Sequence, residues 1–281
     1  MRNLRKTKLL RTLRSKEREN FLREKTKMKK LTTICALVGV LLTASADVKA
    51  TVLSLNFDGA DGATTTVDSS PNGHTPINFF GNAQLDTAEK KSGSASLLLD
   101  GSGDYLTIAD SPDWDVLADA ADDWTIDFWV QQHSYGYQYY LGQRQGGTQR
   151  WAIYYENGLG FYSGFGISLA PAEPISDSDW HWIAFCKVAD EYAMYKDGRQ
   201  INYTKTSAVG DITGILEIGT YATMYCFDGR MDKLRITHSN TFDASPNEYK
   251  TDTIVFHSPE PATIALLGLG ALGLLRRKRK M

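Results

Sequence analysis

Residues 124–130 read WTIDFWV, in which a large apolar side chain stands at every second position. This period is typical of a β-strand that packs one face on a hydrophobic core. It recurs in three further segments, VLSLNF at 52–57, YLTI at 105–108 and WIAFC at 182–186. We therefore predict that strands, rather than helices, build this part of the chain.

Turn signals separate the strand-like segments. Asn157-Gly158 and Asp197-Gly198 each stand between two short apolar segments, a combination that favours a two-residue β-hairpin turn. No long amphipathic helix is indicated between residues 51 and 258. Many short strands without long helices predict an all-β sandwich of two antiparallel sheets.

The first fifty residues have the order of a secretory signal peptide. A basic region is followed by an apolar run at 31–42, which predicts a targeting helix, and by small residues up to Ala46 and Ala50, either of which fits the cleavage site. We interpret Met28 as the true start, because two lysines and the apolar run follow it directly. The alternative for residues 1–50 is a basic arm that binds nucleic acid.

The other end of the chain carries a second apolar run. Pro259, Glu260 and Pro261 precede residues 262–275, and five consecutive cations follow, so the run fits an inner-membrane helix with its basic end in the cytoplasm. This tail, residues 259–281, resembles the PEP-CTERM sorting signal of bacterial envelope and matrix proteins. The resemblance implies that an exosortase-type peptidase recognises the Pro-Glu-Pro triplet and removes the helix. The alternative is a membrane anchor that is never cut.

The charge of the part between these ends differs from that of the whole chain. The full sequence has a formal net charge of -2, but residues 51–258 hold 12 Lys and Arg against 28 Asp and Glu, a net charge of -16. A surface of this sign repels phosphate backbones, so nucleic acid is excluded as a partner of this part. Calcium and neutral glycans remain open as ligands.

Cysteine usage leaves one open question. Cys35 is removed with the predicted signal peptide, so Cys186 and Cys226 are the two thiols exposed to an oxidising compartment. They form either a disulfide or two separate thiols, because the sequence does not give the distance between their Cα atoms.

The order of short motifs along residues 52–238 adds a family resemblance. Seven motifs resemble, in the same order, those of laminin-G-like domains of the concanavalin A-like group: LNFDG at 55–59, Asp68-Ser69-Ser70-Pro71-Asn72-Gly73, LDGSGDYL at 99–106, WTIDFW at 124–129, WHWIA at 180–184, YKDG at 195–198 and FDGRMDKLRI at 227–236. The resemblance implies a jelly-roll β-sandwich with a curved, partly exposed face. We assign residues 51–258 to this domain.

Several aspartates lie beside glycines, where loops can offer oxygen ligands to calcium. In related domains a calcium ion often sits between the first and last strands or at the loop rim. Carried over by position, this implies Asp58 and Asp232 as the principal pair of a structural calcium site, with Asp68 and Asp104 as additional candidates. The alternative is that these aspartates are turn residues that accept hydrogen bonds from their own backbone.

Residues 133–165 are rich in tyrosine, interleaved with Gln and Arg. Flat rings with polar tips suit sugar faces, and amides or guanidinium groups bind hydroxyls, but alternation turns every second ring into the core. The predicted surface residues for a glycan are Tyr135, Tyr137, Gln143 and Arg144. The predicted core tryptophans are Trp129, Trp151 and Trp182.

Signals for catalysis are poor. The sequence has neither two histidines at a metal-ligand spacing nor a Gly-x-Ser-x-Gly elbow, so we expect no enzyme. Our hypothesis is an exported cell-surface or extracellular-matrix protein, whose partners are the secretion machinery and, through a non-catalytic adhesion module, a surface carbohydrate. The alternatives are a structural envelope or matrix component without a discrete ligand, and a glycan-processing enzyme.

Overall fold

The computed structural model describes residues 51–146 and 149–239. The predicted signal peptide with its start at Met28, the Pro259–Pro261 triplet and the apolar run at 262–275 lie outside the described residues, as do the targeting helices expected there. Within the described ranges, no helix combines the length and the hydropathy needed to cross a bilayer.

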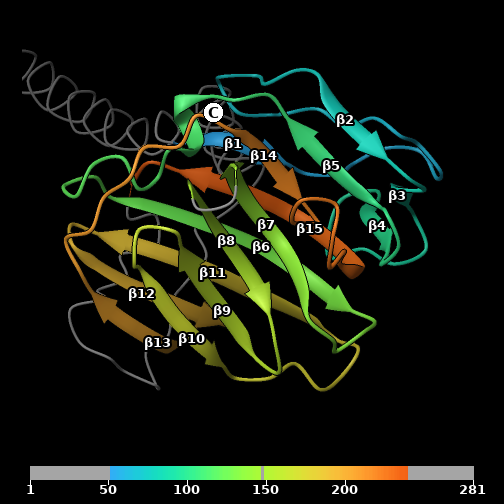
Figure 1. Ribbon diagram of the computed structural model, residues 1–281. Coiled ribbons are helices and arrows are strands. Elements are labelled where there is room, and N and C mark those ends of the chain that lie inside the picture. The colour runs from blue at the N-terminus through green and yellow to red at the C-terminus, as the bar shows by residue number, and fades with distance from the viewer. Residues whose placement is uncertain (1–50, 147–148, 240–281) are drawn as a thin grey trace, which may run out of the picture. The chain divides into compact units, whose positions relative to one another are not determined.

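Two antiparallel sheets face each other and account for the described strands (Figure 1). In the first sheet the neighbours are, in order, β13 (Arg199–Lys205), β12 (Glu191–Lys196), β11 (Trp180–Val188), β6 (Trp124–Gln132), β15 (Asp228–Thr237), β4 (Ser96–Asp100) and β3 (Gln84–Asp86), and β1 (Thr51–Leu55) also pairs with β15. In the second sheet they are β10 (Ser168–Ala172), β9 (Leu159–Ser163), β8 (Gln149–Tyr155), β7 (Gln138–Gln145), β14 (Ile215–Ile218), β5 (Tyr105–Ile108) and β2 (Ile77–Phe80). The predicted all-β sandwich is confirmed.

The core lies between the sheets and follows the predicted alternation. Ile126, Phe128 and Val130 of β6 are fully buried on the inner face. Trp151 of β8 is also in this core, as predicted, and its ring stacks near Phe161 with 6.4 Å between centroids. Asp197-Gly198 forms the predicted two-residue hairpin turn, since Lys196 pairs with Arg199. Asn157-Gly158 also lies in a hairpin turn, but this turn has three residues because Tyr155 pairs with Leu159.

Of the other two tryptophans predicted in the core, Trp182 is confirmed and Trp129 was wrong. Trp129 is half-buried on the outer face of the first sheet, and the ammonium of Lys91 lies 3.7 Å from the centre of its ring. Trp182 is fully buried in a second hydrophobic cluster on that same outer face, where it packs with Ala184 and Tyr195. Trp129 and Trp182 are cross-strand partners, so their side chains point to the same face of the first sheet, the one opposite to Ile126 and Phe128.

A lysine closes one end of the sandwich. Lys187 of β11 is fully buried, and its Nζ donates hydrogen bonds to the carbonyl oxygens of Asp119 (2.9 Å), Ala120 (3.1 Å) and Asp122. These carbonyls belong to the loop between the short 3-10 helix η2 (Pro112–Trp114) and β6. Burial lowers the pKa of the ammonium, and the surrounding aspartates oppose that effect. The lysine thus ties the loop to the inner edge of β11.

His181 at the start of β11 is held by two carboxylates. Its Nδ1 lies 2.7 Å from Asp197 and its Nε2 lies 2.9 Å from Asp177. The hydrogen bond with Asp197 is the main reason that the pKa of His181 is raised, and the bond with Asp177 adds to the effect against burial.

We expect the histidine to make stability depend on pH. Because its pKa is raised on folding, its contribution is complete below the unfolded value of about 6.5 and is lost as pH rises through the folded value. In thermal melts from pH 6 to 8, the melting temperature of the wild type should therefore fall more than that of His181→Gln. Parallel curves for the two proteins would contradict this role.

The two cysteines are separate thiols in the described structure. Cys186 lies opposite Thr125 of β6, which in turn lies opposite Thr237 at the end of β15. Cys226 precedes the other end of that strand, at Asp228. Nine residues of extended strand separate these levels by about 30 Å, far beyond the reach of a disulfide. Of the two alternatives, the structure therefore has the separate thiols.

Candidate functional site

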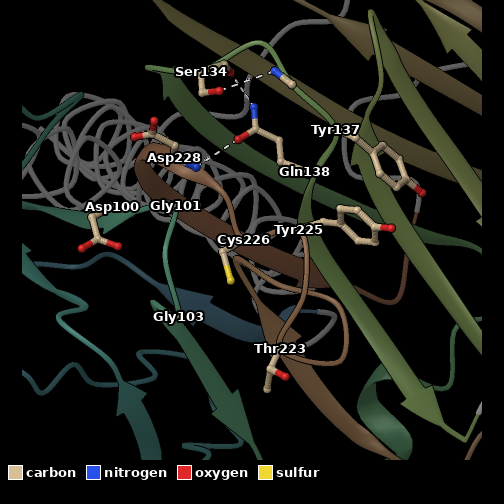
Figure 2. Close-up of a pocket in the computed structure, with 11 residues that line it drawn as sticks. Asp100, Gly101, Gly103, Ser134, Tyr137, Gln138, Thr223, Tyr225, Cys226 and Asp228 are labelled. Atoms are coloured by element: carbon tan, nitrogen blue, oxygen red, sulfur yellow. Dashed lines mark hydrogen bonds between the residues drawn. The ribbon is translucent and has the colours of Figure 1, made fainter.

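Three loops meet at one end of the sandwich and line an open pocket with a volume of ≈ 410 Å³ (Figure 2). The loops connect β4 to β5, β6 to β7, and β14 to β15. The residues that line the pocket are Asp100, Gly101, Gly103, Ser134, Gly136, Tyr137, Gln138, Thr223, Tyr225, Cys226 and Asp228. Figure 2 shows the carboxylates of Asp100 and Asp228 toward one side and the rings of Tyr137 and Tyr225 toward the other.

Gln138 joins two of the loops. Its Nε2 donates to the carbonyl of Ser134 (2.7 Å), and its Oε1 accepts from the backbone N–H of Asp228 (2.9 Å). The third loop packs closely on Asp228 at Gly101, where an added Cβ would lie 2.9 Å from the Cβ of Asp228. Gly101 also has a φ of +77°, which favours glycine. The pocket is therefore built by specific contacts.

The loop that presents Tyr225 has an unusual backbone. Ala222, Thr223 and Tyr225 all have φ between 51° and 62°, a region that residues with a side chain rarely adopt. The carboxylate of Glu217 holds the loop by accepting from the N–H of Ala222 at 3.1 Å, and Thr220 Oγ1 donates to the Met224 carbonyl at 3.1 Å. Strained conformations of this kind gather at binding and catalytic sites.

A tyrosine cluster continues from the pocket over the outer face of the second sheet. Its members are Tyr137, Tyr139, Tyr154, Tyr162, Tyr221 and Tyr225. Ring centres are 4.7 Å apart between Tyr137 and Tyr225, and 4.9 Å apart between Tyr139 and Tyr221. Tyr225 is 51% exposed and Tyr137 is 37% exposed, whereas Tyr139 is buried. The cluster thus offers exposed rings at the pocket, supported by buried rings beneath.

The hydroxyls of the cluster are linked to one another. Tyr139 Oη lies 2.6 Å from that of Tyr137 and 3.2 Å from that of Tyr162. Burial, and then these two hydrogen bonds, raise the pKa of Tyr139 far above its usual range. The Tyr139 hydroxyl therefore stays protonated at neutral pH and can donate as well as accept a hydrogen bond.

Two arginines border the cluster on the side away from the pocket. Arg144 pairs with Glu217 at 3.2 Å, and its guanidinium lies 5.8 Å from the ring centre of Tyr221. Arg150 lies 5.1 Å from the ring centre of Tyr162 and 5.2 Å from that of Tyr221. These are cation–π distances. The site therefore runs from carboxylates in the pocket, over aromatic rings, to guanidinium groups.

The residues predicted for a glycan site fall in different places. Tyr137 lines the pocket and Arg144 borders the tyrosine cluster. Tyr135 is 42% exposed on the same loop as Tyr137 but does not line the pocket. Gln143 is fully buried, so its prediction as a surface residue was wrong.

The reason for Gln143 is its register. It lies opposite the core residue Trp151, and its side chain points inward, where it accepts from Trp151 Nε1 (3.0 Å) and donates to Asp115 (2.6 Å). It also donates to the carbonyl of Ile212 (2.7 Å). These bonds give the amide a structural role.

Asp58 and Asp232, the principal pair predicted for calcium, both accept hydrogen bonds from the backbone of residues 91–94. Asp232 Oδ2 accepts from the N–H groups of Lys91 (2.9 Å) and Ser92 (3.0 Å), and Asp58 Oδ1 accepts from that of Ser94 (2.5 Å). Asp232 Oδ1 is buried and has no hydrogen-bond partner. Burial raises the pKa of Asp232 to about 6, although the N–H donors act against it.

The Oδ1 atom of Asp232 is therefore open to a proton or a cation. A buried carboxylate oxygen without a donor is costly unless a cation or a proton satisfies it. Among the described residues no group of three or more Asp, Glu, His or Cys side chains gathers as a metal site. Calcium at Asp58 and Asp232 would therefore also need backbone carbonyls or water, both of which it accepts readily.

Asp68 and Asp104 have the alternative role of turn residues. Asp68 accepts from the N–H groups of Ser54, Ser70 and His74, at 2.8 to 2.9 Å. The two oxygens of Asp104 accept from the N–H groups of Asn82 and Asp100. Since each oxygen already has a donor, the two carboxylates hold the backbone.

The fold is that of a concanavalin A-like jelly roll. The family model described as the concanavalin A-like lectin/glucanases superfamily, Laminin_G_3, matches residues 100–241, half of the chain, and the protein belongs to this superfamily. Residues 259–280 match the PEP-CTERM protein-sorting motif, which marks an exported protein of the bacterial cell envelope or surface. No curated protein matches the sequence.

Solved structures share the fold at low sequence identity. Domain 4 of AbnA, an extracellular GH43 arabinanase from Geobacillus stearothermophilus solved with arabinotriose, has a TM-score of 0.54 and 16% identity over 68% of this chain and 93% of that one. The binding domain of Paraclostridial Mosquitocidal Protein 1 has a TM-score of 0.52 and 16% identity over 68% of this chain and 49% of that one. The botulinum neurotoxin serotype G binding domain has a TM-score of 0.50 and 15% identity over 67% of this chain and 48% of that one. This chain thus spans about half of the two toxin binding domains.

Proposed function

We propose that the sandwich domain is a non-catalytic carbohydrate-binding module at the cell surface, and that its site is the pocket together with the tyrosine cluster. The observation that carries the proposal is the pair of exposed rings, Tyr137 and Tyr225, in contact at the mouth of a polar pocket. Sugar rings have apolar faces that stack on aromatic rings and hydroxyls that need hydrogen-bond partners nearby. Both kinds of partner are present here.

The polar lining supplies several types of hydrogen-bond partner. Asp100 and Asp228 offer carboxylate acceptors, whereas Ser134 and Thr223 offer hydroxyls that donate or accept. The open shape and polar lining suit part of a polymer better than an apolar small molecule. The arabinotriose held by Domain 4 of AbnA, which shares the fold, adds support for an oligosaccharide as ligand.

The non-catalytic assignment rests on the environment of the pocket carboxylates. Glycoside hydrolysis requires one carboxylic acid kept protonated by apolar surroundings opposite a second carboxylate. Asp100 is exposed, and its two oxygens accept from Ser102 N–H (2.8 Å) and Asn82 Nδ2 (3.3 Å). Asp228 lies 3.6 Å from His133 and is about one third exposed. Neither carboxylate has the apolar enclosure of an acid catalyst.

Calcium has a structural part in the proposed module. Asp58 and Asp232 would hold it beside the backbone of residues 91–94, and it would supply a positive charge to the orphaned oxygen of Asp232. This position is on the first sheet, so we assign the ion to stability of the domain.

The binding site is tested by replacing single tyrosines. Tyr225→Ala and Tyr137→Ala should each weaken binding to a glycan-array hit by about tenfold, because each removes a stacking surface worth roughly 1 to 2 kcal/mol. The measurement is isothermal titration calorimetry with the hit as ligand. Tyr135→Ala is the matched control, since this ring is equally exposed on the same loop but lies outside the pocket.

Two outcomes would contradict the proposal. The first is an equal loss of affinity in Tyr135→Ala, which would remove the pocket from the binding site. The second is release of reducing ends from the bound glycan by the wild type, abolished in Asp228→Asn, which would establish an enzyme. An empty array with the folded wild type would leave the structural envelope component as the better hypothesis.

A further inference from the structure

The two arginines beside the tyrosine cluster have one carboxylate partner between them. Arg144 and Arg150 lie directly opposite each other on β7 and β8, an arrangement of like charges that destabilises a sheet unless anions compensate it. Glu217 makes two contacts with Arg144, at 3.2 and 3.4 Å, and so neutralises one of the two charges. Within the described part of the chain, no carboxylate pairs with Arg150.

Arg150 is an exception among the arginines of residues 51–146 and 149–239. The other four each form an ion pair: Arg144 with Glu217, Arg199 with Glu173, Arg230 with Asp86, and Arg235 with Asp127. Acidic residues outnumber basic ones by 28 to 12 in this domain, yet Arg150 is the one described arginine without a carboxylate partner. Arg150 therefore offers an uncompensated positive charge at the edge of the proposed binding site.

The guanidinium of Arg150 is also fixed in place. The rings of Tyr162 and Tyr221 lie on it at 5.1 and 5.2 Å, and its Nε is buried without a hydrogen-bond partner. Burial acts to lower the pKa of Arg150, but Tyr221 and Tyr162 outweigh it, so the pKa is raised and the charge is permanent. A guanidinium held by flanking rings loses little side-chain entropy when an anion binds.

We propose that Arg150 binds the carboxylate of an acidic sugar residue within a glycan whose neighbouring residues are neutral. The proposal rests on the carbohydrate-binding function above. Tyr221, beside Arg150, and Tyr137 and Tyr225, at the pocket, all pack on the buried ring of Tyr139. One oligosaccharide can therefore lie over the more exposed rings and reach both ends. A planar carboxylate matches the guanidinium fork.

The charge of the domain limits how acidic the glycan is. Its net charge of -16 repels a polymer with a carboxylate on every residue, and Asp100 and Asp228 add local repulsion at the pocket end. A neutral chain with widely spaced uronic acids avoids this repulsion while still placing one carboxylate on Arg150. The ligand class is therefore a sparsely acidic heteropolysaccharide.

The test compares one polymer with and without its carboxylates. The probes are glucuronoarabinoxylan and the same polymer after chemical reduction of its carboxyl groups, each titrated into the full-length protein in detergent. The wild type should bind the acidic polymer at least tenfold more tightly. Arg150→Gln should bind both forms alike, and Arg150→Lys should keep part of the preference, because it retains the charge without the fork. Arg199→Gln, a control at an ion pair with Glu173 outside the site, should keep the full preference.

The outcomes separate this proposal from the one on which it rests. Equal affinity of the wild type for both polymers, with binding weakened by Tyr225→Ala, overturns the acidic-sugar proposal and leaves carbohydrate binding intact. Persistence of the preference in folded Arg150→Gln also overturns it. No binding of either polymer overturns both proposals for this class of glycan. Tighter binding of a sulfated galactan than of the uronate polymer would overturn the choice of carboxylate.

Discussion

Lys187→Met is expected to lower the free energy of unfolding by about 2 to 4 kcal/mol, because the carbonyls of Asp119, Ala120 and Asp122 lose a shared charged donor at the closed end of the sandwich. Met has a similar length and no cavity results, so the loss reports on the hydrogen bonds rather than on packing. In a domain of this size the melting temperature should fall by roughly 5 to 15 °C. Urea denaturation followed by tryptophan fluorescence gives the free energy directly.

The matched control is Lys196→Met. The Nζ of Lys196 donates to a single carbonyl, that of Pro174, at 3.0 Å and near the surface. We expect a much smaller change there. Equal losses in the free energy of unfolding of the two variants would contradict the larger contribution that we assign to the three hydrogen bonds of Lys187.

Calcium is expected to raise the melting temperature of the wild type by roughly 5 to 10 °C relative to the protein in chelator. At a calcium concentration of a hundred times the dissociation constant, binding adds about 2.7 kcal/mol to the free energy of unfolding. Asp232→Asn should lose this shift, because the amide cannot supply the negative charge that the ion requires. Asp68→Asn, a change at a buried turn carboxylate, should keep it.

The shift should also depend on pH, with a sign set by Asp232. Its pKa rises from about 3.8 unfolded to about 6 folded, so without calcium the folded protein loses stability as pH rises from about 4 to 6. Calcium requires the ionised carboxylate, so its stabilising effect should be larger at pH 7 than at pH 5. A wild type that melts at the same temperature in calcium and in chelator at pH 7 has no such site.

The strands could be predicted from the sequence because alternation is a local property. The register between strands is not local, and the error at Gln143 arose there. A β-bulge between Tyr139 and Leu141 changes the parity of β7, so that Tyr139 points outward while Gln143 points into the core. No pattern within the tyrosine-rich stretch at 133–165 reveals such an insertion.

The candidate site was predicted less completely than the fold. Tyr137 and Arg144 were found because they lie in the tyrosine-rich stretch, whereas Tyr221 and Tyr225 come from a loop far along the chain. Only the antiparallel pairing of β14 with β7 brings that loop to the cluster. The segment YATMY at 221–225 carries two aromatic rings beside small residues, and this is the signal that could have indicated a second part of the site.

The place of β15 in the chain has a consequence for the order of events during export. This strand lies at the middle of the first sheet and pairs with β1, β4 and β6, yet it is the last described strand, and Thr51 pairs with Thr237. Until residues 228–237 have been synthesised, β1 has no partner and the sheet has no centre. Folding that depends on such distant contacts is also slow. The strand order therefore delays completion of the first sheet until its last described strand has been made. Until then the chain stays unfolded, which is the state in which a translocation channel accepts it.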